Sequence, residues 1–179
     1  MPIELMEDIQ MKETPEKLPE FDPKTYSFRN ATKDDLDEVA ALYRDWVCED
    51  VTRGLVADTV GALLCRLGPH FILATDKDER VVGFAIAEVS SEHICVFPRG
   101  DNYLVLHDLY VTPDSRRQGI GSSLVTAILQ SGRAKGIRRF TIYSANKHWQ
   151  PTLDFYQEFG FEMWSFSLFL HETSTPLSE

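Results

Sequence analysis

A short stretch at residues 106–121 combines arginines and glycines where an expected strand passes into an expected helix. Arg116 and Arg117 are followed by Gly119 and Gly121. Glycine has no Cβ and tolerates positive φ, so a bulky anion can lie against the backbone here. The first N–H groups of a helix lack intrahelical partners and lie at the positive end of its dipole. The spacing therefore predicts a cradle for a phosphate or pyrophosphate, with both arginines adding charge at its mouth.

This stretch differs from two common phosphate-binding motifs. The sequence has neither G-x-x-x-x-G-K-[ST] nor G-x-G-x-x-G, which excludes a P-loop and a dinucleotide-binding fingerprint. It has instead Arg116-x-x-Gly119-x-Gly121 directly after a strand pattern. Taken alone, so short a pattern is also explained by an ordinary helix that opens with glycine.

A second region suited to chemistry is F-Y-Q-E-F-G-F at residues 155–161. A tyrosine has an ordinary pKa of about 10, so the phenol of Tyr156 suits an acid that stays protonated at neutral pH. The alternative is that these aromatic residues only form a core cluster. We expect this of Phe155 and Phe159, which are four residues apart on one helix face.

Together, in this order, the two motifs resemble the hallmarks of the GNAT (Gcn5-related) N-acetyltransferase family, over about residues 26–170. The resemblance implies a single-domain enzyme that uses acetyl-CoA as co-substrate. Such an enzyme transfers the acetyl group to a primary amine of a small molecule or peptide by direct attack. The alternative is a non-catalytic acyl-CoA-binding regulatory module, because one fold supports several functions.

The resemblance also assigns roles to residues. Tyr156 would protonate the CoA sulfur, and the backbone of Leu109, Tyr110 and Val111 would hold the pantetheine arm. Many members have Asn seven residues before the tyrosine, but here that position is Trp149, and Asn146 nearby is a candidate substitute. The expected pyrophosphate site consists of Arg116, Arg117, Gln118, Gly119, Ile120, Gly121 and Ser122.

A base that accepts the amine proton is a further requirement of this chemistry. His107, Asp108 and Glu88 are the candidates, with plain polar strand residues as the alternative reading. Side chains alternate along a strand, so His107 and Asp108 face opposite sides and at most one of them faces the acceptor cleft. The resemblance places the acceptor loop at residues 46–54.

The interleaved strand and helix patterns predict an α/β fold, and the early hairpin makes its sheet mixed. The resemblance implies a mostly antiparallel central sheet of six or seven strands flanked by about four helices. The resemblance adds a central strand pair that splays apart to admit the pantetheine arm. We expect a hairpin from residues 71–75 and 81–88, strand-like residues at 94–97 and a closing strand at 163–170. The expected organisation is a flexible N-terminal arm (1–24), one acetyltransferase domain (25–172) and a C-terminal tail (173–179).

Composition limits the remaining function classes. The 179 residues carry a net charge of −10, which argues against nucleic acid and is compatible with a cationic acceptor. No apolar run is long enough to span a membrane and no signal peptide is recognisable, so we expect a cytoplasmic protein. The three cysteines lack metal-binding spacing, and no metal is expected. A homodimer is left open.

Overall fold

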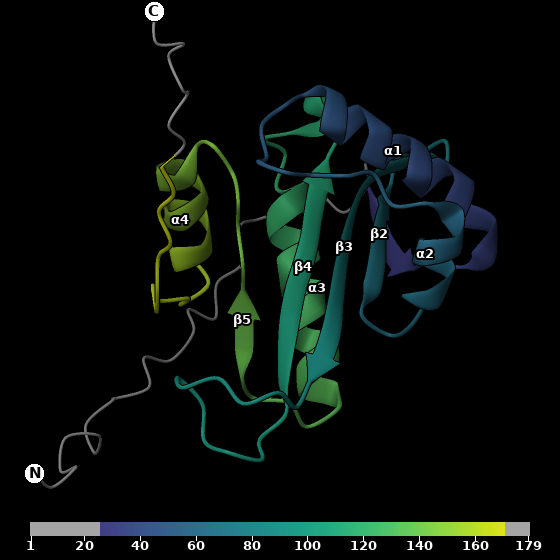
Figure 1. The fold of residues 1–179 in the computed structure, drawn as a ribbon. Coiled ribbons are helices and arrows are strands. Elements are labelled where there is room, and N and C mark those ends of the chain that lie inside the picture. The colour runs from purple at the N-terminus through teal and green to yellow at the C-terminus, as the bar shows by residue number, and fades with distance from the viewer. Residues whose placement is uncertain (1–25, 171–179) are drawn as a thin grey trace, which may run out of the picture.

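A mixed sheet forms the centre of the computed structural model, which describes residues 26–170 (Figure 1). Within these residues the sheet has five strands in the order β1-β2-β3-β4-β5. All neighbouring pairs are antiparallel except β4 and β5, which are parallel. The strands are β1 (Ser27–Asn30), β2 (Phe71–Thr75), β3 (Val81–Ser90), β4 (Tyr103–Val111) and β5 (Phe140–Ile142).

Helices cover both faces of the sheet. In Figure 1, α3 lies behind the strands, α1 and α2 lie over the β2–β3 end, and α4 lies beside β5. Two short 3₁₀ helices, η1 (Lys33–Asp35) and η2 (Pro113–Ser115), precede α1 and the turn into α3. The α-helices are α1 (Leu36–Cys48), α2 (Val60–Cys65), α3 (Ile120–Ala134) and α4 (Trp149–Gln157).

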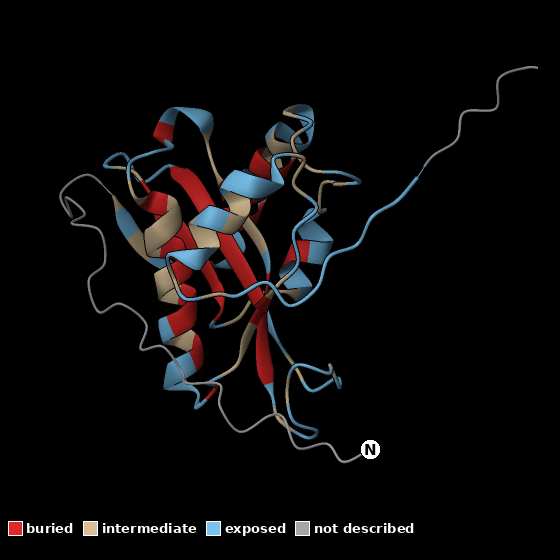
Figure 2. Cartoon of the chain, turned by 90° about the vertical axis from the view of Figure 1, so that its left-hand side faces the viewer, coloured by how far each residue is buried: buried red, intermediate tan, exposed pale blue. Residues whose placement is uncertain are grey.

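The apolar core has two layers, one on each face of the sheet. On one side, Leu124 and Ile128 of α3 pack with Leu104 and Leu106 of β4. On the other, α1 and α2 pack against residues of β2, β3 and β4, including Phe84 of β3. Figure 2 shows that the buried residues are concentrated in the central strands and the helix faces turned toward them. In both layers, the apolar face of a helix therefore packs against apolar strand residues, as the sequence pattern predicts.

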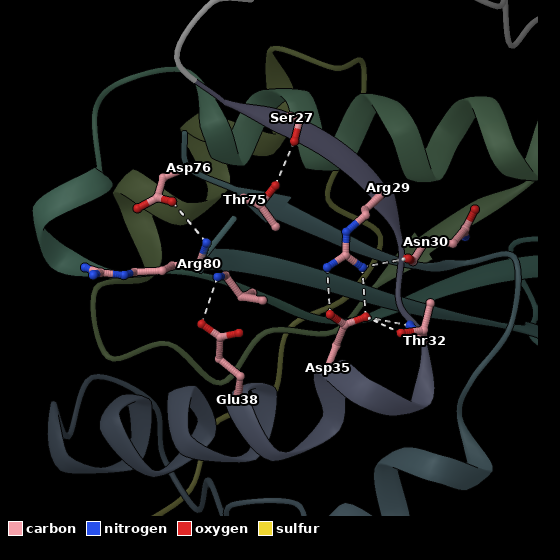
Figure 3. A network of polar contacts seen from close by, with 10 residues as sticks. Ser27, Arg29, Asn30, Thr32, Asp35, Glu38, Thr75, Asp76 and Arg80 are labelled. Carbon is pink, nitrogen blue, oxygen red and sulfur yellow. Dashed lines mark hydrogen bonds and ion pairs between the residues drawn. The ribbon is translucent and has the colours of Figure 1, made fainter. Parts of the chain in front are cut away.

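A polar network fixes the start of α1 on the edge of the sheet (Figure 3). Arg29 of β1 donates from two guanidinium nitrogens to the carboxylate of Asp35, at 2.8 and 2.6 Å. Asp35 also accepts from the backbone N–H of Thr32 at 2.7 Å. One turn later, Glu38 accepts from the backbone N–H of Val81 at 2.9 Å. These contacts tie α1 to β1 and β3.

The structure confirms the mixed sheet and the 71–90 hairpin but not the predicted number of strands. Residues 163–170 have no strand partner within the described part of the chain, so the predicted closing strand is wrong for this structure. Phe166 and Leu168 are 78% and 86% exposed, and a strand whose apolar face stays in water lacks its main stabilisation. Residues 94–97 form a turn closed by the Phe97 N–H on the Ile94 carbonyl, not a strand. The predicted arm (1–24) and tail (173–179) lie outside the described residues.

Candidate active site

A cleft opens where β4 and β5 part. Their parallel pairing runs over three residue pairs and ends with Leu106 opposite Ile142. Beyond this point the two separating segments of the polypeptide line a cleft of about 430 Å³. Its walls come from β4, the β5–α4 loop and α4, and include Leu109, Tyr110, Val111, Tyr143, Asn146 and Tyr156. An extended chain with polar groups fits between two strands whose facing backbone groups are no longer paired.

Tyr156 is presented to this cleft by α4. Its ring meets Phe155 edge to face, with centroids 4.9 Å apart, and Phe161 at 5.9 Å. Burial, with a further contribution from the negative charge of Asp108, raises the pKa of Tyr156 above its ordinary value. The phenol is therefore protonated at neutral pH, and its side chain lines the cleft.

The junction of β4 and α3 presents backbone N–H groups beside the cleft. Gly119 is the N-cap of α3 with φ of 77°, and Arg117 also has a positive φ, of 60°. Within the described residues, the N–H groups of residues 117–119 make no backbone hydrogen bond. Left-handed residues in such a turn direct successive N–H groups toward a common point, where an anion binds. The α3 N-terminus adds its partial positive charge.

The sequence predicts that Arg116 adds charge at the mouth of the anion cradle, but the structure pairs its guanidinium with Glu49. Its guanidinium donates to both carboxylate oxygens of Glu49 at 2.7 Å, and its Nε donates to the carbonyl of Val111 at 2.9 Å. The Tyr110 hydroxyl donates to the same carboxylate at 2.8 Å. Arg116 lines the cleft, but its charge is balanced by Glu49. Nothing in the local sequence indicates this partner, which lies 67 residues earlier.

A second arginine, Arg66 at the end of α2, fixes two of the three candidate bases. It donates to Asp108 at 2.6 Å and to Glu88 at 2.9 Å, and also to Asp58 at 2.8 Å. Burial disfavours the charged guanidinium, but Asp108 and the other partners outweigh this and raise the pKa of Arg66. Neither Asp108 nor Glu88 lines the cleft. The sequence analysis missed Arg66, since a lone arginine at a helix end carries no motif.

His107 differs from these two residues because it lies at a β-bulge. Asp108 pairs with Ile86 and Leu106 with Ala87, so His107 is the extra residue on β4. A bulge changes the direction of a side chain relative to the regular alternation. His107 is exposed and lines the cleft, whereas Asp108 contacts Arg66.

Of the two residues considered for the pantetheine contact, only Asn146 lines the cleft. Trp149 is 63% exposed and does not line the cleft, because the start of α4 directs it into solvent. Asn146 does line the cleft, and its Oδ1 accepts from the backbone N–H of His148 at 2.7 Å. Asn146 therefore remains a candidate contact, and Trp149 does not.

The expected acceptor loop reaches across to the β5–α4 loop. Thr52 and Asn146 form an isolated antiparallel bridge. On either side of this bridge, the Arg53 N–H donates to Ala145 at 3.0 Å and the Lys147 N–H donates to Val51 at 2.8 Å. We call residues 51–53 together with 145–147 the strap. Thr52 and Asn146 both line the cleft.

A metal-binding cluster and a membrane-spanning helix are both absent from the described residues. No group of three or more His, Cys, Asp or Glu side chains is arranged to hold a metal ion within residues 26–170. Over the same residues, no helix has both the length and the apolar character needed to cross a membrane.

Comparison with known proteins places this geometry in a family. Residues 36–161 match the acetyltransferase (GNAT) family. An uncharacterized N-acetyltransferase of Methanocaldococcus jannaschii is 26% identical over 149 residues, which are 78% of this chain and 62% of that protein. This chain therefore spans less than two thirds of that relative.

Solved structures share the fold at lower identity. An aminoglycoside acetyltransferase from an uncultured soil metagenomic sample has a TM-score of 0.63 and 21% identity, covering 87% of this chain and 100% of its own. An aminoglycoside acetyltransferase bound to the bisubstrate analogue CoA-S-monomethyl-acetylneamine has a TM-score of 0.64 and 20% identity, covering 83% and 99%. A Trypanosoma brucei acetyltransferase has a TM-score of 0.60 and 18% identity, covering 82% and 99%. The match over well more than half of the sequence, on a fold with the same architecture, shows that the chain belongs to the GNAT acetyltransferase family.

Proposed function

We propose that the protein transfers an acetyl group from acetyl-CoA to a primary amine of a small molecule or peptide by direct attack. The observation that carries this proposal is the protonated phenol of Tyr156 in the cleft between β4 and β5, beside an N–H cradle at the start of α3. Transfer from a thioester needs an anion site, a channel for the arm and an acid for the leaving sulfur. The three features lie next to one another here.

The residues that would hold acetyl-CoA follow from this arrangement. The backbone N–H groups of residues 117–122 would bind the pyrophosphate. Residues Leu109 to Val111 of β4 pair with β3 but not with β5, and their edge toward β5 would hydrogen-bond the pantetheine arm. A β4 N–H would also polarise the thioester carbonyl. The amine nitrogen then bonds to the carbonyl carbon, the carbon–sulfur bond breaks, and Tyr156 gives its proton to the thiolate.

His107 is the residue we assign to the amine proton. It lies in the bulge and lines the cleft, whereas Asp108 and Glu88 are ion-paired with Arg66. Both carboxylates are held outside the cleft by hydrogen bonds from Arg66, at 2.6 Å for Asp108 and 2.9 Å for Glu88. An imidazole nitrogen that lines the cleft can accept a proton from an amine bound there.

Cationic small-molecule amines are the first acceptors to consider. Two of the structural neighbours are named aminoglycoside acetyltransferases. The chain itself carries a net charge of −10, which attracts cations. A non-catalytic acyl-CoA-binding module on the same fold is the second candidate, and it differs in predicting binding without turnover.

The test combines coenzyme binding with turnover. We expect acetyl-CoA at about 100 times its dissociation constant to stabilise the fold by about 2.7 kcal/mol, measured as a thermal shift. Thiol release is then followed with sisomicin, spermidine and a peptide N-terminus as acceptors. His107→Gln should lower kcat/KM about 10²-fold without changing the thermal shift. Absence of any shift would contradict the family-based proposal, and a shift with no thiol release from any acceptor would favour the regulatory module.

A further inference from the structure

The bulge in β4 reverses the alternation of the side chains along this strand. Leu106 and Leu109 both pack with the core layer of α3, although residues three positions apart face opposite sides of a regular strand. The extra residue between them, His107, accounts for this reversal. Asp108 is thereby placed on the face that α1 and α2 cover, where it meets Arg66. Without the bulge, the register of this half of β4 would turn the Asp108 carboxylate toward the apolar layer of α3.

Arg66 joins the two strands across this bulge. Its Nη2 donates to Asp108 of β4 at 2.6 Å, and its Nε donates to Glu88 of β3 at 2.9 Å. Asp108 pairs with Ile86 on one side of the bulge, and Glu88 pairs with Val105 on the other side. One guanidinium therefore holds a residue from each strand and from each side of the irregularity.

The guanidinium of Arg66 is itself held by other elements. Arg66 is the C-cap of α2, and its Nη1 donates to Asp58 at 2.8 Å and to the Tyr43 hydroxyl of α1 at 3.3 Å. The side chains of Arg66 and Asp108 are only 18% and 14% exposed. Losing one partner of an ion pair with so little water around it leaves the other charge uncompensated. The rigid fork of an arginine also fixes the directions of its acceptors, which a lysine does not.

His107 is the side chain whose direction depends on this register. It is the extra residue of the bulge, it is exposed, and it lines the cleft. Bulges commonly redirect a side chain beside an active site. A contact that selects the bulged register therefore also selects the position of His107.

We propose that Arg66 is a positioning residue for His107. By binding Asp108 and Glu88 on either side of the bulge, it fixes the β4 register that places His107 in the wall of the cleft. The inference rests on the proposed function, which assigns the amine proton to His107. Arg66 does not line the cleft, so it acts through β4 and not on a ligand.

Arg66→Lys tests this role, because it keeps the charge and loses the fork that reaches both strands. We expect kcat at saturating acetyl-CoA and amine to fall about tenfold, since small displacements of a catalytic group lower rates steeply. The affinity for acetyl-CoA should stay close to that of the wild type. In a His107→Gln background, Arg66→Lys should cause no further loss of kcat, because the side chain that it positions is already absent. An equal fall of kcat in both backgrounds would show a purely structural role and overturn the inference.

Two further variants separate positioning from stability. Arg29→Lys is the matched control, because Arg29 also pairs with a largely buried carboxylate, that of Asp35, and does not line the cleft. It should lower the melting temperature and leave kcat unchanged. Glu88→Met breaks only the β3 end of the bridge, at a side chain that is 49% exposed, so this variant should fold even if Arg66→Lys does not. It should lower kcat less than Arg66→Lys does, and a wild-type kcat in Glu88→Met would overturn the bridge across the bulge.

A measurement without turnover separates this inference from the proposed function. The imidazole NMR signals of His107, assigned by comparison with His107→Gln, report the surroundings of this side chain in the ligand-free protein. They should shift in Arg66→Lys and in Glu88→Met, and stay in place in Arg29→Lys. Unchanged signals in both Arg66→Lys and Glu88→Met would overturn the inference. A wild type that releases no thiol with any amine would instead contradict the proposed function, and the NMR comparison would still decide whether Arg66 positions His107.

Discussion

At the scale of single residues, Tyr156 is both a packed aromatic side chain and the candidate acid of the cleft. Its ring packs edge to face with Phe155 and Phe161, which anchors it to the core. Its side chain also lines the cleft, and burial together with the charge of Asp108 keeps it protonated. Packing fixes the ring in place, and the proposed function uses its hydroxyl as the proton donor.

Tyr156→Phe separates the two features, because only the hydroxyl is lost. We expect an acetyl-CoA affinity and a melting temperature close to wild type, and a kcat at least about 10²-fold lower. The measurement is kcat at saturating acetyl-CoA and amine, with the melting temperature as the folding control. A fall in kcat without a fall in affinity assigns the hydroxyl to the transition state. An unchanged kcat would make Tyr156 a core aromatic only.

At the scale of elements, the junction of β4 and α3 carries the proposed anion site, and Gly119 takes a left-handed conformation there. Thr112 and Pro113 end β4 and begin η2, because proline has no N–H for a ladder. Gly119 then takes a left-handed conformation, with φ of 77°, as the N-cap of α3. The other end of α3 is followed by Gly136, with φ of 79° and open space around its α-carbon. The same helix thus has a left-handed glycine at each end, and only one of them adjoins the cradle.

Gly119→Ala and Gly136→Ala form a matched pair. Both place a Cβ on a left-handed residue, so both should lower the free energy of unfolding by about 1–2 kcal/mol. Only Gly119→Ala should also weaken acetyl-CoA binding, because only Gly119 belongs to the turn where we propose that the pyrophosphate lies against the backbone. Urea unfolding and calorimetry of both variants test this. Equal acetyl-CoA affinity in the two variants would mean that Gly119 serves only to start the helix.

At the scale of the whole molecule, stability in acid depends on carboxylates that the fold has fixed in place. Asp35 is the clearest case, since it accepts from Arg29, from the Thr32 N–H and from the Thr32 hydroxyl. The hydrogen bonds from Arg29 are the main cause that holds the pKa of Asp35 well below its usual range. A carboxyl with a lowered pKa stabilises the fold above its unfolded pKa, which is about 3.9, and this contribution disappears as the pH falls toward the folded value.

Asp35→Asn should therefore show a pH-dependent loss of stability. At pH 7 we expect the free energy of unfolding to fall by about 1.5–3 kcal/mol, the range for hydrogen bonds to charged groups. The difference from wild type should shrink steadily below about pH 4, because Asp35 of the unfolded wild-type chain then binds a proton while the folded protein keeps the carboxylate ionised. Urea unfolding at pH 7 and at pH 3 measures this. The exposed neighbour Asp34 is the control, and Asp34→Asn should change stability by less than about 0.5 kcal/mol at either pH.

The sequence by itself determined the local features of this protein. Two apolar runs joined by the charged turn at residues 76–79 predicted the hairpin of β2 and β3, and the arginine–glycine spacing predicted the helix start at Gly119. The alternation rule predicted that at most one of His107 and Asp108 faces the cleft, and only His107 lines it, although the structure places His107 in a bulge that the sequence did not indicate. These features depend on residues within one or two turns of each other, so their chemistry can be read from a short stretch of chain.

The tertiary structure decided every feature that joins distant segments. Only the fold brings Glu49 to Arg116, Arg66 to Asp108, and Thr52 to Asn146. The apolar alternation at residues 163–170 favoured a closing strand, yet a strand requires a partner at its edge, and within the described residues none pairs with it. Contacts between segments far apart in the sequence depend on how the layers pack, and no local pattern carries that information. The cleft beyond Leu106 is a feature of this kind, because it exists only where two strands that begin as neighbours stop pairing.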